Sequence, residues 1–167
     1  NTPTAVAQDI LAIKELFPSI TDFHLHLHNA RGLAMLSMYE AIKCLDHRHT
    51  LIADTTIGGI GGCPYCGNGQ ATGMIPTEDF VHLLDTLGIP TGIRVDRLIE
   101  VSARLSAILG RPLHSQVAMN GGLPSGDTLY DEDVPAVFTF REAQHFRLGP
   151  SVYEGNPKPW LKKDQKA

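Results

Sequence analysis

The fold is decided by the stretch FHLHLHNARG, residues 23–32, in which apolar residues and histidines alternate strictly. A period of two places Phe23, Leu25 and Leu27 on one face of an extended strand and the three histidines on the other face. The side chains of His26 and His28 can both reach one cation at the C-terminal end of this strand. Neutral imidazole binds Mg, Mn or Zn ions when carboxylates or water complete the coordination shell. The stretch predicts either half of a metal site or an exposed polar strand face.

Size, charge and cysteine content exclude several classes of protein. The chain has 167 residues and a formal net charge of −4, with Lys and Arg scattered along it. This length is enough for one domain with a core, and the charge argues against a nucleic-acid partner. No apolar run is long enough to cross a membrane and no N-terminal signal pattern is present, so we expect no membrane partner. Three cysteines without a disulfide framework predict a reducing setting, cytoplasmic or, in a eukaryote, the mitochondrial matrix.

The rest of the chain alternates helices with strands. Helical periodicity is expected over 3–17, 33–45, 77–87 and 96–109, and a second short strand over 50–56. Strands separated by helices predict βα units and a parallel sheet, in which ligands gather at the C-terminal ends of the strands. Because two parallel strands cannot bury themselves, we expect them to belong to a larger sheet.

A long glycine-rich loop, residues 58–73, follows the second strand. Its glycines, which include Gly61 and Gly62, let the backbone approach a ligand closely, and a loop of this length is typical of a lid or binding loop. Cys63 comes next, and a thiol beside a metal or a protonated histidine can transfer protons. The alternative for this residue is a buried, inert thiol.

The segment CPYC, residues 63–66, leaves two further alternatives open. Cys63 and Cys66 have the spacing of a thiol oxidoreductase motif, which predicts a reversible disulfide. The same two thiols are also half of a zinc site, and histidines would then have to supply the other ligands.

The motifs HLHNARG (26–32), DTT (54–56) and GGIGGCPY (58–65) together resemble those of the 3-hydroxy-3-methylglutaryl-CoA lyase family, which are metal-dependent TIM-barrel aldolases. The resemblance runs from residue 1 to about residue 119. It implies an α/β fold in which 1–119 form the C-terminal portion of a (β/α)8 TIM barrel, followed by an irregular C-terminal arm over 120–167. Since the early strands of the family have no counterpart here, the missing N-terminal part of the barrel is an expected partner.

The resemblance also implies a function, the divalent-metal-dependent cleavage of a 3-hydroxyacyl-CoA by a carbon–carbon lyase. A retro-Claisen reaction would release acetyl-CoA and a keto acid. His26 and His28 would hold Mg or Mn, with Zn as the alternative, and His26 would also shuttle a proton. The thiol of Cys63 would protonate the leaving enolate, and Asn29 with Gly61 and Gly62 would contact the acyl-CoA substrate.

One position departs from the family. Relatives carry a Gly-Asn pair just past the loop, and its asparagine binds the metal, whereas this chain has Gly73-Met74. A thioether is a poor ligand for a hard cation, so Asn68 or water is expected to fill that place. The acyl group therefore stays open. The alternatives are a zinc- or CoA-binding module without turnover and another metal-dependent aldolase or acyltransferase of the same barrel group; a homo-oligomer is expected.

Overall fold

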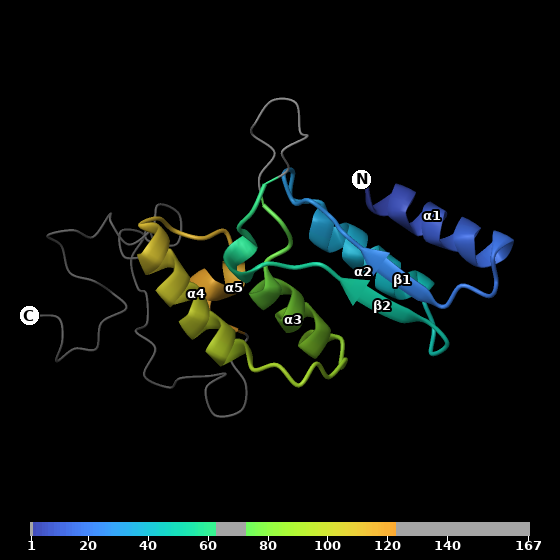
Figure 1. Cartoon of the computed structure of the whole chain (residues 1–167). Coiled ribbons are helices and arrows are strands. Elements are labelled where there is room, and N and C mark those ends of the chain that lie inside the picture. The colour runs from blue at the N-terminus through green and yellow to red at the C-terminus, as the bar shows by residue number, and fades with distance from the viewer. Residues whose placement is uncertain (1, 63–72, 123–167) are drawn as a thin grey trace, which may run out of the picture. The chain divides into compact units, whose positions relative to one another are not determined.

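The computed structural model describes residues 2–62 and 73–122 (Figure 1). The described elements are α1 (Pro3–Leu16), β1 (Asp22–Leu25), α2 (Ala34–Cys44), β2 (Thr50–Ala53), the 3-10 helix η1 (Ile57–Gly59), α3 (Thr77–Thr86), α4 (Val95–Leu109) and α5 (Gln116–Asn120). Helices alternating with parallel strands confirm the α/β class and the expected element order. The sequence analysis did not predict η1 or α5. Residues 123–167 lie outside the described residues, so the irregular arm and its boundary stay predictions.

The two strands form a parallel pair that is shorter than expected. The register runs from Asp22 opposite Thr50 to Leu25 opposite Ala53. The histidine strand was expected to continue to His28, but the ladder ends with Leu25 opposite Ala53. Beyond that point His28 forms an isolated antiparallel bridge with Met74. The end of the histidine stretch is therefore held by the far side of the glycine-rich loop.

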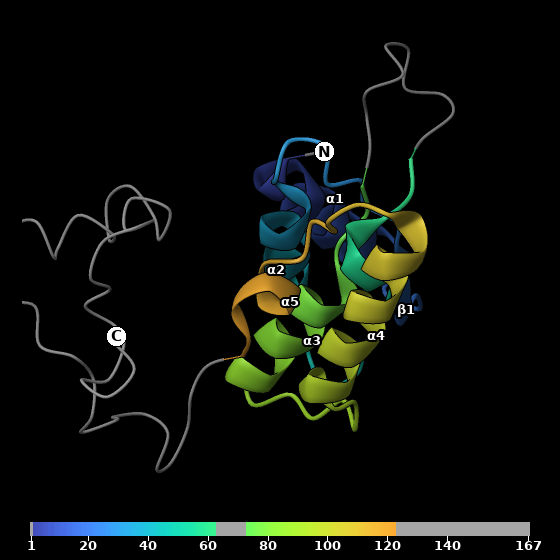
Figure 2. The ribbon, with the colours of Figure 1, turned by 90° about the vertical axis from the view of Figure 1, so that its left-hand side faces the viewer.

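Helices α1 and α2 lie side by side and cover one face of the strands (Figures 1 and 2). The first begins at an N-cap, where the Thr2 hydroxyl accepts a hydrogen bond from the N–H of Ala5. Phe23 and Leu27 are each 6% exposed and belong to the same core cluster as Val6 and Met38. The apolar face of the histidine stretch is therefore the buried face, as the alternation predicted.

Helix α3 is tied to the segments around it by the two acids of its first turn. The carboxylate of Glu78 is fully buried and accepts the N–H of Gly58, with N–O distances of 2.9 and 3.0 Å. The carboxylate of Asp79 accepts the N–H of Val117 at 2.8 Å and the hydroxyl of Ser115 at 2.7 Å. These two acids therefore fix η1 and the start of α5 against the first turn of α3.

Helix α4 has the periodicity expected over 96–109, but the apolar side chains along it are only partly buried. Ser102 is the buried residue of this helix, whereas Val101 is 46% and Ile108 81% exposed. No described residue covers that face of α4. None of the described helices combines the length and hydrophobicity that a bilayer span requires.

Candidate metal centre

The histidine face lies opposite the face that α1 and α2 cover. His26 is exposed and His28 half-buried, and their rings meet edge to face with centroids 5.1 Å apart. Their Nε2 atoms are 3.3 Å apart. The structure therefore brings together the two predicted imidazole ligands, each with the same ring nitrogen facing the other.

Asp54 follows β2 directly and connects His26 to a third histidine, His24. Its Oδ1 lies 2.7 Å from Nε2 of His24, and its Oδ2 lies 2.8 Å from Nδ1 of His26. Hydrogen bonds to His24 first and His26 second hold the pKa of Asp54 below its usual value. Because a carboxylate only accepts hydrogen bonds, His26 donates its Nδ1–H, and in the neutral ring the lone pair is then on Nε2.

The two imidazoles fit one cation as part of its ligand set. Two nitrogens at about 2.1 Å from one ion are 3.3 Å apart when they subtend roughly 100° at it, which agrees with the observed separation. His28 Nδ1 is buried and has no hydrogen-bond partner among the described residues. Residues 2–62 and 73–122 contain no group of three or more His, Cys, Asp or Glu side chains able to hold a metal. Further ligands would have to come from water, from substrate or from residues outside these two ranges.

The ends of the glycine-rich loop lie beside this pair. Gly73 accepts the N–H of Asn29 at 3.0 Å and donates its own N–H to Gly61 at 2.8 Å. Met74 is buried and bridges to His28, so a thioether residue lies beside the histidine pair where the resemblance implies an asparagine. Cys63 and Asn68 lie outside the described residues, and their expected closeness to the histidines stays a prediction.

The three residues expected to contact substrate differ in their surroundings. The side-chain oxygen of Asn29 accepts the N–H of Ala34 at 3.2 Å, next to the start of α2, where Leu33 provides no side-chain cap. Gly61 and Gly62 are exposed, and Gly61 has φ 114°, which favours glycine. The amide oxygen of Asn29 therefore has a structural partner, while the two glycines are accessible.

Sequence reasoning missed Asp54 as the partner of two histidines. A signal for it existed, since an acid directly after a parallel strand faces the same strand ends as the histidines. It also missed the burial of Glu78, for which the sequence holds no signal. Burial raises the pKa of Glu78. Hydrogen bonds from the backbone N–H groups of Glu78 and Gly58 offset part of this rise.

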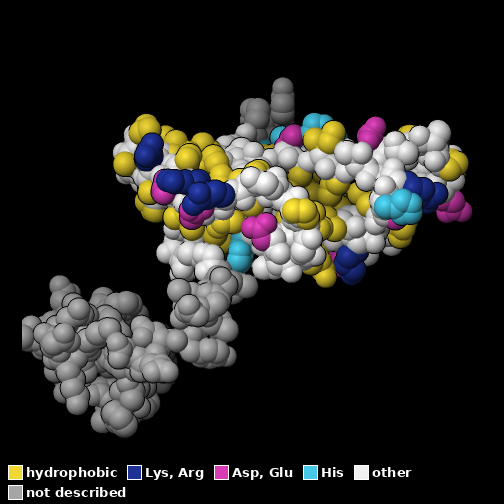
Figure 3. Space-filling view, turned by 90° about the horizontal axis from the view of Figure 1, so that it is seen from below, with side chains coloured by type: hydrophobic (Ala, Val, Ile, Leu, Met, Phe, Trp, Pro, Cys, Tyr) yellow, Lys and Arg dark blue, Asp and Glu magenta, His cyan; other side chains and the backbone are white. Residues whose placement is uncertain are grey.

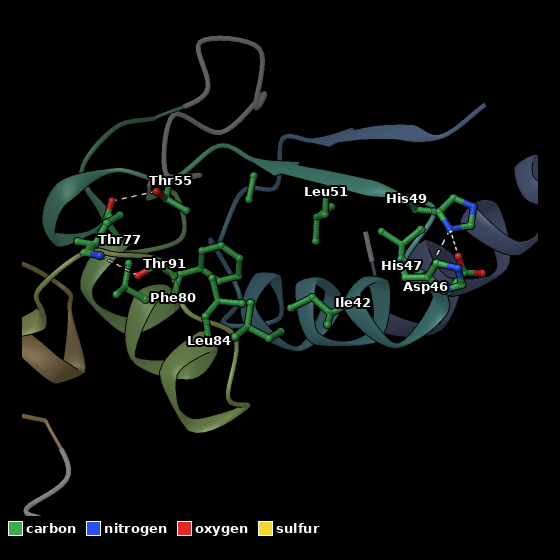
Figure 4. A pocket seen from close by; sticks show the side chains of 15 residues that line it. Ile42, Asp46, His47, His49, Leu51, Thr55, Thr77, Phe80, Leu84 and Thr91 are labelled. Atoms are coloured by element: carbon green, nitrogen blue, oxygen red, sulfur yellow. Dashed lines mark hydrogen bonds and ion pairs between the residues drawn. The ribbon is translucent and has the colours of Figure 1, made fainter. Parts of the chain in front are cut away.

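A cavity of about 760 Å³ lies on the other face of β2, between α2 and α3 (Figure 4). Leu51 and Ala53 line it, and they alternate along the strand with Ile52 and Asp54. The wall is mostly apolar, although His49 and Asp46 form a hydrogen bond at one end, with Nδ1 and Oδ1 2.9 Å apart. Figure 3 shows hydrophobic side chains exposed on the face seen from below, with acidic and basic side chains intermixed. The histidine pair is not among the residues that line the cavity.

Comparison with known proteins identifies the relatives of this chain. No protein-family model matches it. (R)-Citramalyl-CoA lyase of Chloroflexus aurantiacus is 41% identical over 119 residues, which are 71% of this chain and 35% of the relative. Mitochondrial hydroxymethylglutaryl-CoA lyase of Bos taurus is 32% identical over 118 residues, which are 71% of this chain and 34% of the relative.

Solved structures give the same result. An HMG-CoA lyase from Acinetobacter baumannii, in complex with coenzyme A and 3-methylmalate, matches with a TM-score of 0.62 and 35% identity, over 73% of this chain and 38% of that one. The Bacillus subtilis HMG-CoA lyase matches with a TM-score of 0.60 and 28% identity, over 71% and 38%. The chain spans about a third of the length of the curated relatives it matches. Over about 71% of its length, this chain is a partial hydroxymethylglutaryl-CoA lyase-like protein.

Proposed function

We propose that this chain is the C-terminal part of a divalent-metal-dependent carbon–carbon lyase that cleaves a 3-hydroxyacyl-CoA. The observation that carries the proposal is the pair of Nε2 atoms 3.3 Å apart at the end of a parallel strand. Such strand ends are where ligands bind in barrels and open α/β sheets. The relatives named as citramalyl-CoA and hydroxymethylglutaryl-CoA lyases support a CoA ester as substrate.

The (β/α)8 TIM barrel belongs to this proposal. A two-stranded parallel sheet covered on one face is not an independent fold, because parallel sheets are normally covered on both faces. The described part of the chain supplies two parallel strands and the helices beside them. The remaining strands would come from the missing N-terminal part of the barrel, which we infer to be a partner.

His26 and His28 would hold the divalent ion, with Asn68 or water in place of the family's asparagine. When bound, the ion would polarise the hydroxyl and carboxyl oxygens of the substrate. Asp54 accepts a hydrogen bond from the Nδ1–H of His26, and Nε2 of His26 faces His28. Because both ring nitrogens are engaged, a shuttle role for His26 requires one of these contacts to open. The thiol of Cys63 would give its proton to the leaving enolate carbon of acetyl-CoA, with the keto acid as the other product.

The test is His26→Ala in the full-length protein, with release of acetyl-CoA from citramalyl-CoA and HMG-CoA as the assay. We expect the variant to lose metal-dependent cleavage of whichever ester the parent protein accepts, because the site loses one of its two described ligands. His47→Ala is the matched control, since His47 is exposed and lies outside the histidine face. Cleavage retained by His26→Ala would contradict the proposal.

Metal analysis tests the alternative of a zinc module without turnover. Weak, exchangeable Mg or Mn agrees with the lyase. One equivalent of tightly bound Zn that is lost in Cys66→Ser would instead favour the module.

A further inference from the structure

We propose that Asp54 is the positioning residue of this cation site, which orients His26 toward the ion, and that His24 in turn holds Asp54. The inference rests on the proposed function, because it concerns the same pair of histidines. It adds two residues, Asp54 and His24, and assigns them a positioning role.

The backbone fixes where Asp54 lies. Its N–H donates to the carbonyl of Leu25 at 3.0 Å, one step beyond the last pair of the β1–β2 ladder. The residues flanking Leu25 are His24 and His26, whose side chains share one face of the strand. The carboxylate of Asp54 therefore reaches both rings, and both of its oxygens are used, at 2.7 and 2.8 Å.

The chemistry of the carboxylate fixes which nitrogen of His26 is available. With the Nδ1–H of His26 donated to Asp54, Nε2 carries the lone pair that faces His28. His28 has no such partner among residues 2–62 and 73–122, since its Nδ1 is buried without a hydrogen bond. Its ring is held by packing, whereas the ring of His26 is held by Asp54.

Exposure explains why this hydrogen bond is needed. The side chains of His24 and His26 are each 58% exposed and that of Asp54 is 41% exposed. An exposed imidazole rotates freely unless a hydrogen bond fixes it, and rotation would move Nε2 away from His28. By occupying Oδ1, His24 keeps Oδ2 turned to His26, so it acts on the site only through Asp54.

Asp54→Asn tests the proposal in the full-length protein, with Mn²⁺ as the probe. The asparagine side chain has nearly the same shape but only one acceptor oxygen, so one of the two histidines loses its partner. We expect the Mn²⁺ affinity, measured from free Mn²⁺ by electron paramagnetic resonance, to fall about 10- to 100-fold. In the metal-free protein, ¹⁵N NMR of His26 should change from one dominant Nδ1–H tautomer to a mixture. His24→Ala should weaken Mn²⁺ binding less than tenfold.

The control is Asp46→Asn, which removes a carboxylate that is paired with His49, away from the histidine face. It should leave both the Mn²⁺ affinity and the His26 tautomer unchanged. If His26→Ala abolishes Mn²⁺ binding while Asp54→Asn keeps both the affinity and the tautomer, the positioning role is overturned and the proposed function stands. If His26→Ala binds Mn²⁺ as the parent does, the proposed function fails, and the metal-binding part of this inference fails with it.

Discussion

Replacing Gly58 with alanine should destabilise the fold at the start of the glycine-rich loop through two separable effects. Gly58 has φ 61°, a left-handed conformation that costs a residue with a Cβ about 1–2 kcal/mol. The added Cβ would also lie 2.6 Å from Cβ and 2.9 Å from Cγ of Leu113, and against its Cδ1. Since Leu113 is 7% exposed, its side chain cannot move into solvent, and overpacking costs about 1–3 kcal/mol more. We expect Gly58→Ala to lower the free energy of unfolding by about 2–5 kcal/mol.

Gly32→Ala separates the two effects. Gly32 has φ 73°, and a Cβ there would meet no atom within 4 Å, so it should lose only the backbone contribution of about 1–2 kcal/mol. The assay is urea unfolding of the full-length protein, followed by circular dichroism at pH 7. If the two variants lose the same free energy to within about 0.5 kcal/mol, the packing of Gly58 against Leu113 is refuted.

Two further predictions concern the buried acid and the substituted metal position. Burial raises the pKa of Glu78 above its ordinary value of 4.5. At a pH between 4.5 and the raised pKa, the folded chain therefore binds more protons than the unfolded chain. The free energy of unfolding should therefore fall as the pH rises from about 4.5 through the raised pKa and then level off, and Glu78→Gln should remove this contribution in urea titrations at several pH values. Met74→Asn places an amide oxygen beside His28, so we expect it to tighten Mn²⁺ binding at least about tenfold, whereas Met74→Leu should not. Equal Mn²⁺ affinities in the two Met74 variants would count against a cation next to this position.

The histidine face was predictable from the sequence because one local pattern encodes it. Strict alternation over 23–28 places Phe23 and Leu27 in the core and turns the histidines away, as the structure confirms. The same kind of reasoning was less successful on α4. Its helical stripe is present, yet Val101 and Ile108 are exposed. A periodic pattern shows that a face is apolar, but not which element covers it.

The roles of Asp54 and Glu78 depend on contacts between distant segments. Asp54 meets the histidines because Leu25 pairs with Ala53, and a shift of one residue in that register would turn its side chain to the other face. Glu78 is buried because η1 folds back over the first turn of α3, where acids ordinarily interact with solvent and the helix dipole. Local periodicity contains neither the register nor the fold-back.

Within residues 2–62 and 73–122, the histidine face has neither a covering element nor further metal ligands. Helices α1 and α2 cover one face of the strands, and within the described residues each strand has a ladder partner on one edge only. The exposed face carries two imidazoles set for one cation, but no third ligand in the described part of the chain. Strands added beside β1 and closed into a barrel would enclose this face and would also bring side chains to the same strand ends. Closure of the sheet and completion of the cation site should therefore be coupled, so that Mn²⁺ bound at His26 and His28 also stabilises the docking of the missing strands.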